Sequence, residues 1–246
     1  MKNKFLLALF LGASTIYGCK DNAPALTKKE KSVPDVYKKI YGAKKIYLEN
    51  DFVVIETNGI PDHKSPYFQG TEWESSKYEA NTSSSFSPNS HKIGIANTVY
   101  KIPLNPKQAT EHQATSGHIG VAVNGIPFFN QYQGQTTLLR PSEKATFDQY
   151  NGHPTALNWY HYHLEPVFIT ANKGANALVG FLIDGFPVYG PVENGNVVSN
   201  SNLDSFHGHF GVTADYPDGI YHYHITTAAP YINGDGYYGT PGTVSF

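Results

Sequence analysis

The feature of this chain that most limits its fold is a set of short segments that occurs twice in the same order. Residues 120–130 (GVAVNGIPFFN) reappear as residues 180–190 (GFLIDGFPVYG), an offset of 60 positions. Each copy is an apolar run, an Asn-Gly or Asp-Gly pair suited to a tight turn, a proline and a second aromatic run. The pattern predicts two β-hairpins of the same kind.

Two further segments follow each hairpin. Residues 147–153 (FDQYNGH) match residues 203–209 (LDSFHGH), and the Tyr-His-Tyr-His run 160–163 matches 221–224. A repeat of about 60 residues with its own hairpin and histidine strand predicts two related β units. We expect these units to pack face to face as one sandwich- or barrel-like domain, with the functional site between them.

The composition predicts an all-β fold. The chain of 246 residues contains 18 Tyr, 14 Phe, 23 Gly and 16 Pro, a mixture of strand-forming and turn-forming residues. Residues 51–57 (DFVVIET) predict a strand, whereas Ser-rich residues 74–92 and polar residues 107–116 predict loops.

The charge pattern argues against a nucleic-acid partner. The formal net charge is -2, only 15% of residues are charged, and the sequence has no basic stripe, that is, no cluster of Lys and Arg residues. Proteins that bind nucleic acid usually show such a stripe. We therefore expect no nucleic-acid binding.

The amino terminus predicts export. Two lysines precede an apolar run from Phe5 to Tyr17, which has the length of a signal-peptide core and is shorter than the roughly 20 residues of a transmembrane helix. Gly18 and Cys19 follow as a lipobox, so residues 1–18 are predicted to be a lipoprotein signal peptide. The alternative is an ordinary secretory signal in which Cys19 lies near the cleavage point by chance.

Cys19 is the only cysteine of the chain. A protein lipidated there has no thiol left for disulfides or metal ligation, and its acyl chains would anchor it to the membrane. Residues 19–35 are polar and predict a tether, and residues 36–246 would form the β domain. The expected location is the cell envelope, as an outer-membrane lipoprotein facing either the periplasm or the cell surface.

The histidine strands predict a metal site. Side chains alternate between faces along a strand, so His161 and His163 share one face, as do His222 and His224. Two imidazoles at this spacing can share a transition metal.

The Gly-His segments supply further candidate ligands. His153 and His209 could each complete a set of three imidazoles, with His207 as an additional candidate. Three histidines and an open position are typical of a catalytic zinc site or a copper site, so copper or zinc is the predicted cofactor. Asp148 and Asp204 are predicted either to orient imidazole N–H groups or to cap loops.

Two interpretations without a metal stay open. Tyrosine and neutral histidine can act as general acid and base, as in a polysaccharide lyase or hydrolase with a long groove. Alternatively, the histidines are structural and hydrogen-bonded within a tyrosine-rich sheet of a binding module. Whether the chain is an enzyme is therefore not decided by residue types.

Together these segments resemble the YHYH-domain family, which takes its name from paired Tyr-His-Tyr-His strands. The resemblance covers residues 51–239, and it implies an exported protein. Many relatives carry cysteines close to the Gly-His segments, where this chain has Tyr150 and Phe206. If those cysteines form disulfides in relatives, aromatic packing must replace them here. The segments that carry the resemblance are 58–63, 120–127, 147–154, 160–163, 184–191, 203–209, 221–224 and 230–231.

Overall fold

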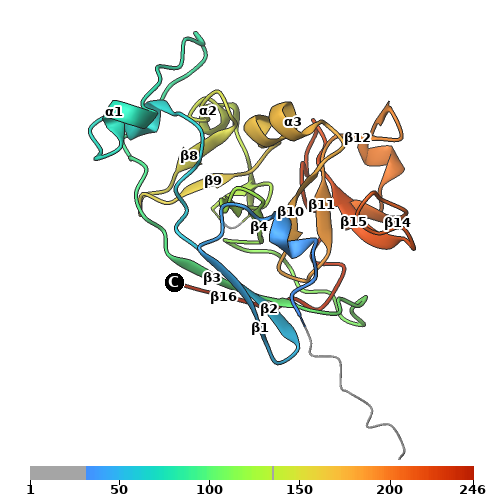
Figure 1. The fold of residues 1–246 in the computed structure, drawn as a ribbon. Coiled ribbons are helices and arrows are strands. Elements are labelled where there is room, and N and C mark those ends of the chain that lie inside the picture. The colour runs from blue at the N-terminus through green and yellow to red at the C-terminus, as the bar shows by residue number, and fades with distance from the viewer. Residues whose placement is uncertain (1–31, 135) are drawn as a thin grey trace, which may run out of the picture. The chain divides into compact units, whose positions relative to one another are not determined.

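The structure of the protein is a computed structural model that describes residues 32–134 and 136–246. One compact unit spans Ser32–Phe246. The predicted signal peptide, Cys19 and most of the predicted tether lie outside the described residues. The described part consists mainly of β-strands joined by loops, with three short α-helices (Figure 1). The prediction of a mainly β fold is confirmed.

A four-stranded antiparallel sheet contains the strand predicted at residues 51–57. That strand is β2 (Phe52–Thr57), which lies between β1 (Lys45–Glu49) and β3 (Thr98–Pro103). Strand β16 (Thr243–Ser245) pairs with the free edge of β3. The β-branched residues 53–55 are completely buried, as expected for a central strand.

An eight-stranded sheet contains both histidine motifs. Its strands, in the order in which they lie across the sheet, are β14 (Gly208–Gly211), β15 (Ile220–His224), β11 (Pro187–Tyr189), β10 (Leu178–Leu182), β4 (Gly120–Ala122), β5 (Pro127–Phe128), β9 (Tyr160–Tyr162) and β8 (Gly152–Pro154).

The two predicted hairpins are confirmed. Strands β4 and β5 form one hairpin and β10 and β11 form the other. Gly125 and Gly185 occupy their turns with φ angles of 81° and 92°, a conformation that glycine adopts without steric cost.

The two hairpins meet in the middle of the sheet. Strands β4 and β10 pair antiparallel with Val121 opposite Phe181. A Cβ atom on either Gly120 or Gly180 would lie 2.3 Å from a carbonyl oxygen of the opposing strand. Only glycine fits at these two positions, so the recurring glycine that opens each hairpin permits the central pairing.

The same order of strands extends to both sides of this central pair. On each side, the second hairpin strand pairs parallel with a histidine strand (β9 or β15), which pairs antiparallel with a Gly-His strand (β8 or β14). The segments of the two predicted units thus lie side by side in one open sheet. The face-to-face and barrel-like arrangement was wrong, because backbone pairing of β4 with β10 joins the hairpins edge to edge.

One hydrophobic core serves both large sheets. Its buried cluster includes Ile55 and Tyr100 from the four-stranded sheet and Phe128 and Phe181 from the eight-stranded sheet. Tyr37 stacks on Phe181 with ring centroids 4.4 Å apart. The eight-stranded sheet is buried on both faces, because its register places Phe128 on the face of the motif tyrosines and Phe181 on the opposite face, which also carries the histidine side chains.

Smaller elements complete the described chain. Within residues 32–134 and 136–246, none of the helices combines the length and apolar character that membrane crossing requires. The Ser-rich segment 74–92 starts as α1 and continues as a loop, and residues 107–116 form a loop as predicted. The remaining elements are the hairpins β6 (Tyr132–Gln133) with β7 (Thr137–Leu138) and β12 (Val192–Glu193) with β13 (Asn196–Val197), the α-helices α1 (Glu74–Lys77), α2 (Pro141–Lys144) and α3 (Val167–Lys173), and three 3-10 turns at Tyr37–Lys39, Pro66–Phe68 and Asn200–Asn202.

Candidate functional site

Strand pairing brings a third histidine to each His-x-His motif. In the register of β8 with β9, His153 lies directly opposite His161, and in that of β14 with β15, His209 lies opposite His222. Six of the eleven histidines thereby gather in two separate groups that could hold a metal ion. A single site between the two predicted units had been expected, but within the described residues the two clusters lie at opposite ends of the strand order of the sheet.

The first cluster consists of His153, His161 and His163, all buried. The Nε2 atoms of His153 and His161 are 3.1 Å apart, and those of His161 and His163 are 2.9 Å apart. All three ligand atoms lie within 4.8 Å of one another. The three imidazoles therefore turn the same ring nitrogen toward a common point.

The opposite ring nitrogen of each imidazole is held by the protein. His161 Nδ1 donates to the Trp159 carbonyl oxygen at 3.2 Å, and His163 Nδ1 donates to that of Asn130. A carbonyl oxygen can only accept, so these Nδ1 atoms carry the ring protons and their Nε2 atoms carry lone pairs. The backbone thus selects the tautomer that a metal requires.

Two unprotonated Nε2 atoms cannot hydrogen-bond to each other. At a separation of 2.9 Å, the lone pairs of His161 and His163 face each other without a proton between them. Burial lowers the pKa of His163 to about 4 and that of His153 to about 3, so these rings are neutral near pH 7. A metal cation between them would convert this repulsion into attraction.

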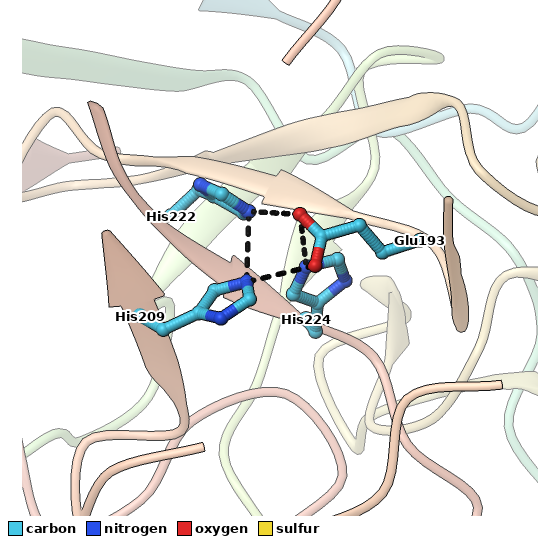
Figure 2. A group of neighbouring side chains, drawn as sticks. All are labelled: Glu193, His209, His222 and His224. Atoms are coloured by element: carbon cyan, nitrogen blue, oxygen red, sulfur yellow. Dashed lines mark hydrogen bonds and ion pairs between the residues drawn. The ribbon is translucent and has the colours of Figure 1, made fainter. Parts of the chain in front are cut away.

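The second cluster consists of His209, His222, His224 and Glu193 (Figure 2). The Nε2 atoms of His209 and His222 are 3.1 Å apart. Each of these two nitrogens lies 3.3 Å from a carboxylate oxygen of Glu193. This group therefore contains three imidazoles and one carboxylate. The carboxylate comes from the short strand β12.

Backbone carbonyls fix the tautomers of the second cluster too. His222 Nδ1 donates to Ile220 O at 3.0 Å, and His224 Nδ1 donates to Gly190 O at 2.9 Å. Their Nε2 atoms therefore face the Glu193 carboxylate as acceptors facing an acceptor. His224 Nε2 is buried and has no hydrogen-bond partner, a state that proteins rarely tolerate.

The tyrosines of each motif point to the other face of the sheet, where three of them donate hydrogen bonds to carboxylates. Tyr160 donates to both Asp148 oxygens at 2.9 and 2.8 Å, and Tyr221 donates to Asp204 at 2.9 Å. Tyr223 donates to Asp184 at 2.6 Å. The alternation of the motif thus separates two functions: histidines form the clusters, and tyrosines anchor the strands.

One prediction was that Asp148 and Asp204 orient the cluster imidazoles. The structure gives both carboxylates other partners. Besides the tyrosine hydroxyls, Asp148 accepts backbone N–H groups of Tyr150 and Gly152. Asp204 accepts those of Phe206 and Gly208. Both carboxylates cap the turn before a Gly-His strand, which was the other prediction, because strand alternation places them across the sheet from the histidines.

His207 lies outside both clusters. It occupies a left-handed turn position with a φ angle of 75°, and its Nε2 bonds to Thr226 Oγ1 at 2.9 Å. Tyr150 and Phe206 pack against other rings: the ring centroids of Tyr150 and His63 are 4.5 Å apart, and those of Phe206 and His112 are 4.1 Å apart.

Sequence reasoning missed Glu193. The equivalent position of the first copy, 60 residues earlier, is Gln133, so a comparison of the two copies gives no sign of a carboxylate ligand. The first cluster has a different carboxylate nearby, because Glu143 Oε1 on α2 lies 3.6 Å from His153 Nε2.

The comparison with protein families matches the part of the chain that contains both clusters. A model of the YHYH protein family matches residues 99–197 and 192–236, which include every residue of both clusters. The chain belongs to the YHYH protein family. No curated protein and no solved structure matches it. Within this YHYH protein, the motif of the family name therefore supplies His161, His163, His222 and His224 to the clusters.

The anchor of His153 gives a test of the first cluster. Thr146 Oγ1 donates to the Glu143 carbonyl oxygen at 2.7 Å and therefore accepts from His153 Nδ1, also at 2.7 Å. Partners of this kind fix the ring and its tautomer, and their loss typically weakens metal binding by about 10- to 100-fold.

We expect Thr146→Val to weaken zinc binding at the first cluster by roughly 10-fold, measured by competition with a chromogenic chelator. The second cluster would be disabled by His222→Ala with His224→Ala, so that one site is measured. Thr170→Val is the matched control, since the Thr170 hydroxyl is buried but bonds to Glu165 at 2.6 Å. Equal losses in both variants would contradict the assigned role of Thr146.

Proposed function

We propose that this protein binds two transition-metal ions, copper or zinc, one in each histidine cluster. The observation that carries the proposal is the convergence of three imidazole Nε2 atoms in each cluster, with the tautomers of His161, His163, His222 and His224 fixed by backbone carbonyls. Neutral imidazole is a good ligand for both metals. Five of the six imidazoles already make, on their far side, the hydrogen bond that a metal-bound imidazole needs.

The donor sets support different coordination at the two clusters. The first offers three imidazoles, the set found in open zinc sites where a water or substrate takes the fourth position. The second offers three imidazoles and the Glu193 carboxylate, enough for a four-coordinate ion. A softer ion such as copper would favour the first cluster over the second.

We also infer that the two sites belong to related β units. The 60-residue offset of the hairpins and the equal order of strands on both sides of the β4–β10 pair support this inference. Each unit would then contribute a complete site built on the same strand register.

The alternative of metal-free acid-base chemistry has less support. Within each Tyr-His-Tyr-His run, tyrosines and histidines point to opposite faces, so the motif does not pair them as acid and base. Tyr231 and Tyr237, which lie outside the two motifs, are buried and present no free ring face on which a sugar could stack.

Elemental analysis tests metal binding. We expect the full chain, purified without a histidine tag, to hold two equivalents of metal, and His161→Ala with His163→Ala, or His222→Ala with His224→Ala, to hold one. The quadruple variant should hold none. His207→Asn is the control, because it changes a buried histidine outside both clusters and should keep both ions. Absence of metal in the unchanged chain, even after incubation with copper and zinc, would refute the proposal.

We further propose that the protein is lipid-anchored through Cys19 in the cell envelope. The signal sequence and lipobox support this location, and so does the lone cysteine. Cys19→Ser should move the chain from the detergent-rich phase to the aqueous phase in a detergent phase-partition experiment. Because the change removes only the acyl acceptor, both metals should be retained. Unchanged partitioning of the variant would show that Cys19 is not the anchor.

A further inference from the structure

The first cluster lines a pocket of its own. This metal pocket has a volume of about 380 Å³, within the size range of small-molecule sites, and His153, His161 and His163 all form part of its lining. Within the described residues, the ligand atoms that converge there come from these three imidazoles alone. A four-coordinate metal in the first cluster would therefore keep one coordination position open, and the pocket gives a small molecule room to reach it.

Glu143 lines the same pocket without belonging to the donor set. Its Oε1 lies 3.6 Å from His153 Nε2. His153 Nδ1 donates to Thr146 Oγ1, so His153 Nε2 is an acceptor and cannot donate to Glu143. The Glu143 carboxylate is thus placed to accept a hydrogen bond from a molecule bound in the pocket. It differs in this respect from Glu193, which belongs to the donor set of the second cluster.

A second pocket, which is largely apolar, adjoins the metal pocket. It has a volume of about 490 Å³, and one wall is formed by Trp159, which stacks on Phe246 with ring centroids 4.7 Å apart. Leu157 also lines it and is 64% exposed. An apolar group bound there would remove these side chains from water, which is favourable. The residues that line both pockets are Gly117, Phe129, Thr155 and Ala156.

We infer that the two pockets together bind a small neutral acyl compound, such as an amide or a hydroxamic acid, that carries an apolar side chain. This inference rests on the proposed metal binding. The acyl oxygen would take the open position of the metal in the first cluster, and an N–H or O–H group would donate to Glu143. The apolar side chain would lie against Trp159 and Leu157.

The charges around the first cluster favour a neutral ligand over a carboxylate. Glu143 already places a negative charge beside the three imidazoles, and a second carboxylate in the pocket would be repelled by it. The second cluster would hold its ion without such a ligand, because Glu193 completes its set of four donors.

Calorimetric titration of the zinc-loaded full chain with benzohydroxamic acid and, separately, acetohydroxamic acid tests the inference. The chain would carry His222→Ala and His224→Ala, so that only the first cluster holds zinc. Both probes have the same metal-binding group, and they differ in a phenyl against a methyl group. We expect benzohydroxamic acid to bind at least about 10-fold more tightly, because its ring is buried in the apolar pocket. The variant His161→Ala with His163→Ala, which keeps only the second cluster, should bind both probes at least about 10-fold more weakly.

Two substitutions test the two pockets separately. Leu157→Ser should weaken binding of benzohydroxamic acid by roughly 3-fold and leave that of acetohydroxamic acid unchanged. Leu138→Ser is the matched control, since Leu138 is also exposed, at 55%, but lines neither pocket. Glu143→Gln should weaken binding of both probes by about 10-fold, because a neutral amide oxygen accepts a weaker hydrogen bond than a carboxylate does.

Zinc content, measured on the same samples, separates two kinds of failure. If the chain with only the first cluster holds one zinc ion and neither probe binds, the ligand site is refuted and the metal sites stand. If the unchanged chain holds no zinc, both proposals fail. Equal affinity for the two probes, or equal losses in Leu157→Ser and Leu138→Ser, would overturn the inference. Loss of zinc from Glu143→Gln would also overturn it, because Glu143 would then be a metal ligand and the position would not be open.

Discussion

The hydrogen bond from imidazole Nδ1 to a backbone carbonyl is the interaction on which both clusters depend. It is made by His161, His163, His222 and His224, in each case with a carbonyl fixed by the neighbouring sheet or loop. Because the carbonyl can only accept, it determines the tautomer, the ring orientation and the position of the free lone pair. The strand register then adds His153 and His209 as the third histidines of the clusters.

This arrangement has a cost that links the clusters to folding. Buried imidazoles with converging lone pairs repel one another, and a buried acceptor without a partner is unfavourable. The tyrosines offset part of this cost, since Tyr160 and Tyr221 tie the back of each histidine strand to a carboxylate. A metal that binds only the folded chain would supply the rest, so metal binding and folding should be coupled.

Much of this architecture follows from local sequence. The Asn-Gly and Asp-Gly turns determine the hairpins, and strand alternation places His161 with His163 and His222 with His224. The order of the repeated segments also predicted that His153 and His209 lie beside the His-x-His motifs, and both belong to the clusters. Each of these features depends on residues that are close in sequence or on the pairing of two strands. Sequence patterns can therefore predict them.

Long-range features could not be predicted in the same way. The pairing of β4 with β10 depends on two glycines that permit close contact between distant strands, and either glycine alone looks like an ordinary turn residue. Glu193 reaches the second cluster from a two-residue strand whose counterpart carries Gln133. Asp148 precedes a histidine strand in sequence, yet lies across the sheet from the histidines because Tyr160 binds it there.

The central claim is that each His-x-His motif presents unprotonated Nε2 atoms to a metal. Long-range nitrogen-15 NMR correlation of the histidine side chains, with and without zinc, tests it most directly. We expect His161, His163, His222 and His224 to carry their protons on Nδ1 at pH 7, and their Nε2 signals to shift when zinc binds. Protons on Nε2, or Nε2 signals that zinc leaves unchanged, would contradict the claim.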